Sequence, residues 1–233
     1  MLRKVADRLG PGARVADVVT DGGGAGWRAC AEPVGAVTNE DTVVVGHGLA
    51  VPAAVAVAER WPVRGLVLSD GPVTRLDPVT AHLVALSARA PALLHAALLQ
   101  PAVWTAWLRS SAGLRRAVVN PYVMDRDTVA ALCGSIVATA ALRTSFTTYL
   151  QSLATLPDVT RLRCPVAAVW GDDDWLYPAS EASFLVSAHA GAPNVAIPGG
   201  RFGHPEERPW ALADAVRELS SQLGTAPSAA AAP

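Results

Sequence analysis

The sequence has few charged residues and few cysteines, and both shortages limit what the protein can do. Only 17% of its 233 residues are charged, and the formal net charge is −1. Nothing here provides the strongly basic surface that binds nucleic acid or an anionic membrane, so we expect neither partner. The three cysteines, Cys30, Cys133 and Cys164, have no CxxC spacing. We therefore expect buried thiols in a reducing compartment, with no disulfide framework and no metal site.

Long hydrophobic runs are also absent, although 51% of the residues are hydrophobic. No apolar run is long and uninterrupted enough to span a bilayer. The first residues, Met1–Arg8, form an amphipathic helical pattern without the apolar centre of a signal peptide. The composition predicts a sizeable buried core, and we expect a cytoplasmic protein.

A nucleotide-binding motif is absent too. The segment Asp21–Trp27 is rich in glycine, but a dinucleotide fingerprint starting at Gly22 would require a third glycine where Trp27 stands. The same loop has no lysine for a phosphate-binding P-loop. We expect a simple turn after a short strand, and no cofactor.

What the sequence does contain is the alternation of a parallel α/β fold. An apolar β-branched run ends at Gly46, a helical run follows over Ala50–Arg60, and a second apolar run covers Val63–Ser69. This strand–helix–strand spacing predicts a mainly parallel sheet flanked by helices. Further strands are expected over Arg14–Thr20, Cys164–Trp170 and Asn194–Ile197, and further helices over Met1–Leu9, Cys30–Thr38, Ala179–Ala190 and Pro209–Leu223.

Residues 78–156 change character, because they hold Ala- and Leu-rich helical segments and no strand signal. We expect a helical insertion over 78–156, a core formed by 1–77 and 157–224, and a disordered tail at 225–233. The insertion's aromatic residues either line a substrate pocket or pack the insertion against the core. The pocket candidates are His47, Trp104, Trp107, Tyr122 and Trp175.

The segment Gly46-His47-Gly48-Leu49-Ala50 has the layout of a nucleophile elbow, a sharp strand-to-helix turn whose central residue is exposed at the carboxyl end of the sheet. Small residues lie on both sides of the turn. The central residue is Gly48, which has no side chain and cannot attack a substrate.

Two later loops carry an acid and a base in the order expected after an elbow. Trp170-Gly171-Asp172-Asp173-Asp174, with Pro178, is similar to the acid loop of the α/β-hydrolase superfamily, and Gly203-His204-Pro205-Glu206-Glu207 is similar to its base loop. With the elbow and the insertion, the chain resembles a capped α/β-hydrolase in which Gly48 replaces the nucleophilic serine.

The resemblance implies site residues one by one. His204 takes the position of the general base, and Asp174 takes that of the carboxylate that orients it. Asp172 and Asp173 remain open as alternatives, and so does Asp70, for which a turn role is favoured. The backbone N–H of Leu49 is the evident oxyanion donor, and His47 is expected to hold the elbow.

The chain departs from the family at its N-terminus, where the leading strands and the oxyanion loop have no counterpart. Either Val15–Thr20 pairs directly with the elbow strand, or one edge of the sheet stays open. Three explanations remain: the sequence starts late relative to the natural gene product, the fold has shrunk, or a second copy or another partner covers the gap.

Three functional hypotheses follow. The first is an enzyme for a small apolar molecule, in which a His–Asp dyad activates water for ester or lactone hydrolysis or moves a proton in a lyase or cyclase step. The second is a non-catalytic protein that binds a ligand or partner in the same pocket. The third is an engineered Ser-to-Gly variant of a serine hydrolase.

Overall fold

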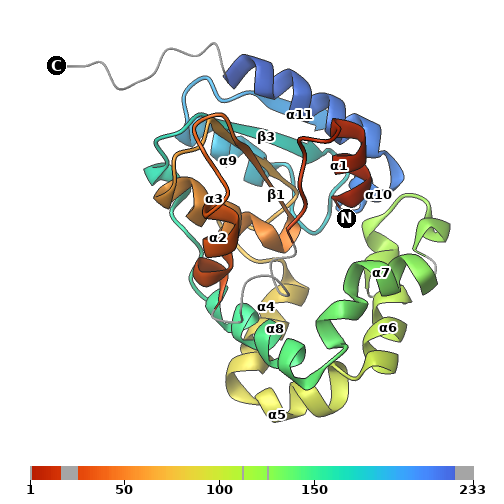
Figure 1. Cartoon of the computed structure of the whole chain (residues 1–233). Coiled ribbons are helices and arrows are strands. Elements are labelled where there is room, and N and C mark those ends of the chain that lie inside the picture. Colours follow the sequence, from red (N-terminus) through yellow and green to blue (C-terminus); the bar gives the residue numbers. More distant parts are fainter. Residues whose placement is uncertain (1, 17–25, 112, 125, 224–233) are drawn as a thin grey trace.

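The computed structural model describes residues 2–16, 26–111, 113–124 and 126–223, and a parallel sheet forms its centre (Figure 1). The strands are β1 (Val43–His47), β2 (Gly65–Ser69), β3 (Val166–Gly171) and β4 (Asn194–Ile197), and they lie in this order across the sheet. The register pairs His47 with Ser69, Ser69 with Val169 and Gly171 with Ile197. Residues that follow these strands therefore meet at one edge.

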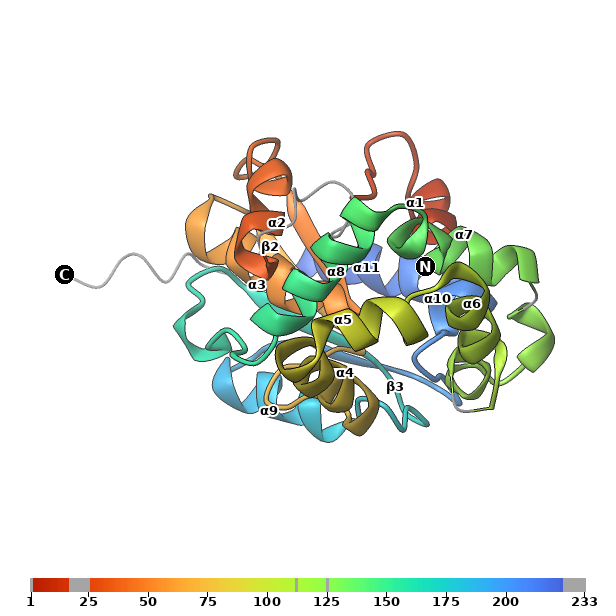
Figure 2. The same ribbon diagram turned by 90° about the horizontal axis from the view of Figure 1, so that it is seen from below.

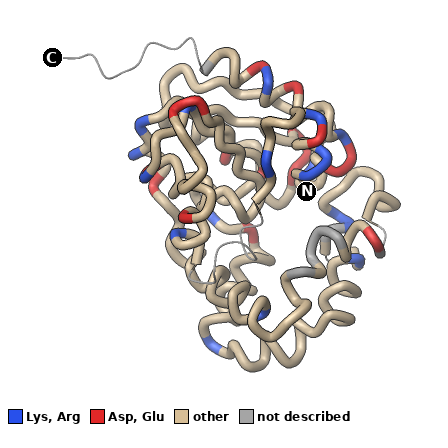
Figure 3. Tube along the Cα trace, in the orientation of Figure 1, with Lys and Arg blue, Asp and Glu red and all other residues tan. Residues whose placement is uncertain are grey.

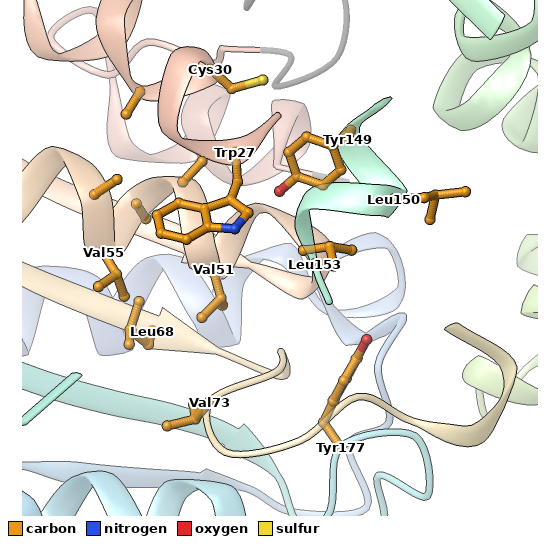
Figure 4. Packing of buried hydrophobic residues seen from close by; sticks show 14 of the residues in the cluster. Trp27, Cys30, Val51, Val55, Leu68, Val73, Tyr149, Leu150, Leu153 and Tyr177 are labelled. Carbon is orange, nitrogen blue, oxygen red and sulfur yellow. The ribbon is translucent and has the colours of Figure 1, made fainter. Parts of the chain in front are cut away.

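Helices cover both faces of the sheet because alternate strand residues point to opposite sides. On one face, α2 (Trp27–Gly35) packs on α3 (Val51–Arg60), which lies on β1 and β2. Figure 4 shows Trp27 between Val51, Leu68 and Tyr149 in this core. On the other face, α1 (Arg3–Leu9) and α11 (Pro209–Leu223) cover a second apolar cluster that includes Val67 and Val169.

The chain between β2 and β3 is helical and lies at the carboxyl end of the sheet (Figures 1 and 2). Its elements are α4 (Pro78–Arg89), α5 (Pro91–Leu93), the π-helical turn η2 (Leu94–Leu98), α6 (Pro101–Arg109), the 3₁₀ turns η3 (Leu114–Ala117) and η4 (Pro121–Val123), α7 (Arg126–Val137) and α8 (Ala140–Ser152). The remaining elements are η1 (Gly48–Ala50), η5 (Val159–Arg161), α9 (Ser180–Ala188) and α10 (His204–Glu207). The prediction that this segment is helical is thus confirmed. That it forms a domain separate from the core stays a prediction.

The α/β class and the order of the elbow, insertion and later strands agree with the sequence. The predicted helix over Cys30–Thr38 begins earlier, at Trp27, where Gly26 (φ +86°) precedes it. The Trp27 indole N–H donates to the Ser152 carbonyl at 2.9 Å, which ties α2 to the end of α8. An added Cβ at Gly26 would lie 2.6 Å from the Ser152 side chain, so this junction requires glycine.

Some expectations concern residues that the structure does not describe. Most of the predicted strand Arg14–Thr20, the glycine-rich loop and the tail 225–233 lie outside the described residues. Within the described ranges, no strand pairs with the outer edge of β1. A second copy or partner at this edge therefore stays a prediction.

No described helix alone combines the length and apolar composition that crossing a bilayer requires; α4 with Pro91–Leu98 meets them only as a pair bent by 116°.

A buried carboxylate holds the loop that follows β2. Glu181 on α9 accepts hydrogen bonds from the backbone N–H groups of Val73 (3.0 Å) and Thr74 (2.7 Å), and from the Thr74 hydroxyl (2.7 Å). A buried charge is tolerated when such donors surround it. Glu181 thereby fixes the segment that leads out of the sheet edge.

We predict that Glu181→Ala lowers the free energy of unfolding by about 3 kcal/mol, because two backbone N–H groups lose a charged acceptor. Urea unfolding measures the change, with Glu59→Ala on the exposed end of α3 as the control. Equal losses in the two variants would contradict the role assigned to Glu181.

Candidate active site

The centre of the site is the carboxylate of Asp70, which directly follows β2 and is fully buried. Its Oδ1 accepts the backbone N–H of Gly171 at 2.8 Å, and its Oδ2 accepts the Ser69 hydroxyl at 2.6 Å. His204 Nε2 lies 2.7 Å from the same Oδ2. Asp70 has a φ of +40°, a left-handed conformation that Asp adopts more readily than most residues. Two neighbouring strand ends and the base loop thus converge on one carboxylate.

The contact with Asp70 determines which nitrogen of His204 can act as a base. An ionised carboxylate only accepts hydrogen bonds, so His204 carries its proton on Nε2 when it is neutral. The lone pair then lies on Nδ1, which is buried without a hydrogen-bond partner among the described residues. Such an atom costs free energy unless a ligand or water binds to it, which is a feature of functional sites.

His47, in the elbow, is held neutral beside this pair. Burial lowers its pKa from 6.5 to about 3, although the charge of Asp70 acts in the opposite direction. Its Nδ1 lies 3.3 Å from the Ser69 hydroxyl. Because Ser69 donates its proton to Asp70, its oxygen can accept from His47 Nδ1, and we assign the N–H of His47 to Nδ1 on this ground. His47 Nε2 is also buried and makes no hydrogen bond among the described residues.

The structure corrects the predicted partner of His204. Asp70, the less favoured alternative, makes the contact, and no hydrogen bond or ion pair joins His204 to Asp174 in the part of the chain that is described. The three aspartates of the acid loop bind elsewhere. Asp172 accepts the Gly199 N–H at 2.6 Å, Asp173 pairs with Arg201 at 2.9 Å, and Asp174 accepts the Leu176 N–H at 2.9 Å.

Asp174 nevertheless belongs to the same electrostatic unit. Burial, with the negative charge of Asp70 as the next contribution, raises its pKa from 3.8 to about 8. Its Oδ2 is buried without a hydrogen-bond partner among the described groups. Burial and the neighbouring carboxylate thus both favour the protonated form of Asp174.

Gly48 has the backbone of a nucleophile elbow without a nucleophile. Its φ is +58°, in the left-handed region, and it follows β1 directly. A Cβ added there would lie 2.8 Å from the ring of Phe202. The ring also packs on His47, with centroids 5.0 Å apart. The Phe202 ring thus occupies the space in which a side chain at position 48 would stand.

The predicted pocket residues lie in three separate places. Trp104 is buried inside the helical insertion, with ring centroids 5.2 Å from Trp107 and 5.7 Å from Phe146. These distances support the packing alternative for that group. Tyr122 and Trp175 are exposed, and only His47 lies at the His204–Asp70 pair.

The proposed oxyanion donor lies on the elbow. The Tyr149 hydroxyl of α8 donates to the carbonyl of Leu49. This bond links the insertion to the turn after β1. The role of the Leu49 N–H stays a prediction.

The residues also form a possible metal-ligand set. One donor atom each from His47, Asp70 and His204 lie within 4.8 Å of one another. Two histidines and a carboxylate suit divalent transition metals. In this structure, however, Asp70 Oδ2 bonds to His204, and the Ser69 hydroxyl lies within hydrogen-bond reach of all three side chains. The arrangement is explained by hydrogen bonding alone.

Sequence reasoning missed Ser69 and Phe202. Ser69 is the last residue of β2, and its neighbour Asp70 was known to follow a strand. The rule that parallel strands bring their carboxyl ends together could have placed both beside His204. No comparable signal locates the ring of Phe202, because it depends on the path of the loop after β4.

The raised pKa of Asp174 predicts a measurable pH dependence. Between about pH 4 and pH 8, the Asp174 carboxyl keeps its proton in the folded protein and loses it in the unfolded chain, so its contribution to the free energy of unfolding falls as pH rises through this window. His47, with its lowered pKa, has the opposite effect only between about pH 3 and 6.5. Asn does not titrate, so Asp174→Asn removes the contribution of the Asp174 carboxyl. Between pH 6.5 and 8, the variant should therefore gain stability relative to the unaltered protein, by at most about 1.4 kcal/mol per pH unit. A constant difference in urea titrations would contradict the protonated state.

Comparisons with known proteins identify the fold. No family model matches the chain, and no curated protein matches its sequence. Solved structures do match. A thermophilic esterase from Thermogutta terrifontis aligns at a TM-score of 0.61 and 18% identity, covering 92% of this chain and 77% of the esterase. The epoxide hydrolase CorEH aligns at 0.64 and 16% identity, covering 86% and 76%. An α/β-hydrolase fold protein from Burkholderia ambifaria aligns at 0.61 and 19% identity, covering 88% and 75%. With a parallel sheet, an elbow after β1 and a histidine loop after β4, this chain has the α/β-hydrolase fold.

Proposed function

We propose that this protein is an enzyme that uses His204, oriented by Asp70, as a general base and that forms no covalent intermediate at the elbow. The observation that supports this most directly is the 2.7 Å contact between His204 Nε2 and Asp70 Oδ2, in a fully buried environment. Solved structures that resemble this chain include an esterase and an epoxide hydrolase. The substrate class we propose is a small apolar molecule, as an ester, a lactone or a compound with an acidic C–H or O–H.

In the hydrolytic version of this proposal, His204 Nδ1 takes a proton from water as the water oxygen bonds to the substrate carbonyl carbon. The positive imidazolium is stabilised by Asp70, whose position is held by Gly171 and Ser69. The imidazolium then returns the proton to the leaving oxygen as the carbon–oxygen bond breaks. In the lyase or cyclase version, Nδ1 takes the proton directly from the substrate.

Access to His204 is the main physical requirement of this proposal. The imidazole and Asp70 are fully buried, and Phe202 covers the elbow. The Phe202 ring packs on His47 and lies where a side chain at Gly48 would stand, so a substrate can approach the elbow only if this ring turns away. The loop that carries Phe202 begins with Gly199 and Gly200, and Gly199 has a φ of +61°. Glycine allows more backbone conformations than other residues, which would help this loop to move the ring.

The same burial favours the second candidate function, a non-catalytic protein that binds a ligand or a partner. Under this alternative, the Phe202 ring is a permanent part of the core and the His204–Asp70 pair stabilises the fold. The two candidates differ in one result: only the enzyme loses turnover when the base is removed while the protein stays folded.

We predict that the unaltered protein hydrolyses some members of a panel of activated aryl esters and lactones, and that His204→Ala and Asp70→Asn lower this rate by about 10²–10⁴-fold. His82→Ala, at an exposed position on α4, is the matched control and should keep the rate. Circular dichroism of each variant shows whether it is folded. Unchanged turnover in a folded His204→Ala variant would refute the proposed base.

The elbow generates a separate prediction. Gly48→Ser should lower the free energy of unfolding by at least about 1–2 kcal/mol, because a residue with a Cβ adopts the left-handed φ of this position at a steric cost and because the new Cβ approaches Phe202. It should also create no serine-hydrolase activity. In a Phe202→Ala background the same substitution should cost less, because the ring is gone. Identical costs in the two backgrounds, measured by urea unfolding, would show that Phe202 does not occupy this position.

A further inference from the structure

A concave region lies on the outside of the molecule, between the helical insertion and the loops that follow β3 and β4. It is a hollow of about 430 Å³. The insertion contributes Arg115 and Arg116 from η3, the loop after β3 contributes Asp173 and Trp175, and the loop after β4 contributes Arg201. Three elements that are far apart in the sequence therefore place three guanidinium groups around one hollow.

The charge of this hollow differs from that of the chain as a whole. Three arginines line it against one aspartate, whereas the formal net charge of the protein is −1. Residues 78–156 contain six arginines, two aspartates, and neither lysine nor glutamate. Figure 3 shows how sparse charged residues are over α4–α8 compared with the layers around the sheet. Three arginines thus lie around one hollow where the insertion meets the core.

Two of the guanidinium groups are held in place by contacts within the protein. The Arg116 guanidinium lies 5.1 Å from the ring centroid of Trp175, and the Trp175 indole N–H donates to the Arg116 carbonyl at 2.9 Å. Arg201 donates to Asp173 at 2.9 Å and to the carbonyl of Val118 at 3.3 Å. Restraint of this kind lowers the entropy that an arginine loses when it binds an anion.

Exposed apolar side chains surround the charged part. Trp175 is 41% exposed, Val119 is 48% exposed, and the neighbouring Tyr122 is 84% exposed. Large exposed aromatic groups beside arginines are typical of binding surfaces. A ligand that satisfies both parts has an oxyanion attached to a flat apolar body.

We propose that this hollow binds a small molecule that carries a carboxylate or phosphate group on an aromatic or similarly apolar body. Arg116 and Arg201 bind the oxyanion, with Arg115 adding positive charge, and the Trp175 face contacts the apolar body. The proposal goes beyond the catalytic one and does not depend on it, because none of these side chains belongs to the His204–Asp70 pair.

Isothermal titration with benzoate and phenyl phosphate tests this site, with benzamide as the neutral counterpart of benzoate. We expect saturable binding of one benzoate or phenyl phosphate per chain and no detectable binding of benzamide. Arg116→Gln and Arg201→Gln should each weaken phenyl phosphate binding by about tenfold or more. Arg163→Gln, which removes an exposed arginine outside the hollow, is the matched control and should leave the affinity unchanged.

Two further arms distinguish the parts of the ligand. Trp175→Ala should weaken phenyl phosphate more than inorganic phosphate, because only the former has an apolar body. The proposal is overturned if benzamide binds as tightly as benzoate, or if both arginine variants bind like the unaltered protein. Equal affinity for inorganic phosphate and phenyl phosphate would overturn the part assigned to Trp175.

Discussion

The site depends on one buried carboxylate, Asp70. A fully buried negative charge is expensive unless donors surround it, and here the donors come from three places: the end of β2, the end of β3 and the loop after β4. Satisfying Asp70 therefore fixes the relative positions of two strand ends and the histidine. The same charge opposes ionisation of Asp174 and adds to the burial that raises its pKa to about 8. The Asp70 carboxylate thus influences both the geometry of the site and the pKa of Asp174.

The turn after β1 has the backbone conformation of a nucleophile elbow, but its central residue, Gly48, has no side chain. Gly48 has the left-handed φ that a nucleophile elbow imposes, and glycine adopts it without the steric cost of a Cβ. Phe202 then packs where that Cβ would stand. A side chain at position 48 would therefore have to displace the Phe202 ring. This supports chemistry in which the base acts on water or substrate directly.

Much of the fold could be predicted from the sequence, because the apolar β-branched strands and the helical insertion have strong local patterns. The positions of Gly48 and His204 could also be predicted, since each lies in a short motif at a strand end. The choice between Asp70 and Asp174 could not. Both follow strands that end at the same edge, and only the three-dimensional path decides that Asp174 accepts the Leu176 N–H while Asp70 faces His204. The arginine hollow was equally hidden, because Arg116 and Arg201 are brought together by tertiary packing alone.

The most direct test of this account is the tautomeric state of His204, measured by nitrogen-15 NMR of the imidazole rings with His204→Gln to assign the signals. If Asp70 orients the ring, the neutral form of His204 carries its proton on Nε2 and has an unprotonated Nδ1, and Asp70→Asn perturbs this signal strongly. A neutral His204 with its proton on Nδ1, insensitive to Asp70→Asn and sensitive to Asp174→Asn, would contradict the account and make Asp174 the orienting carboxylate.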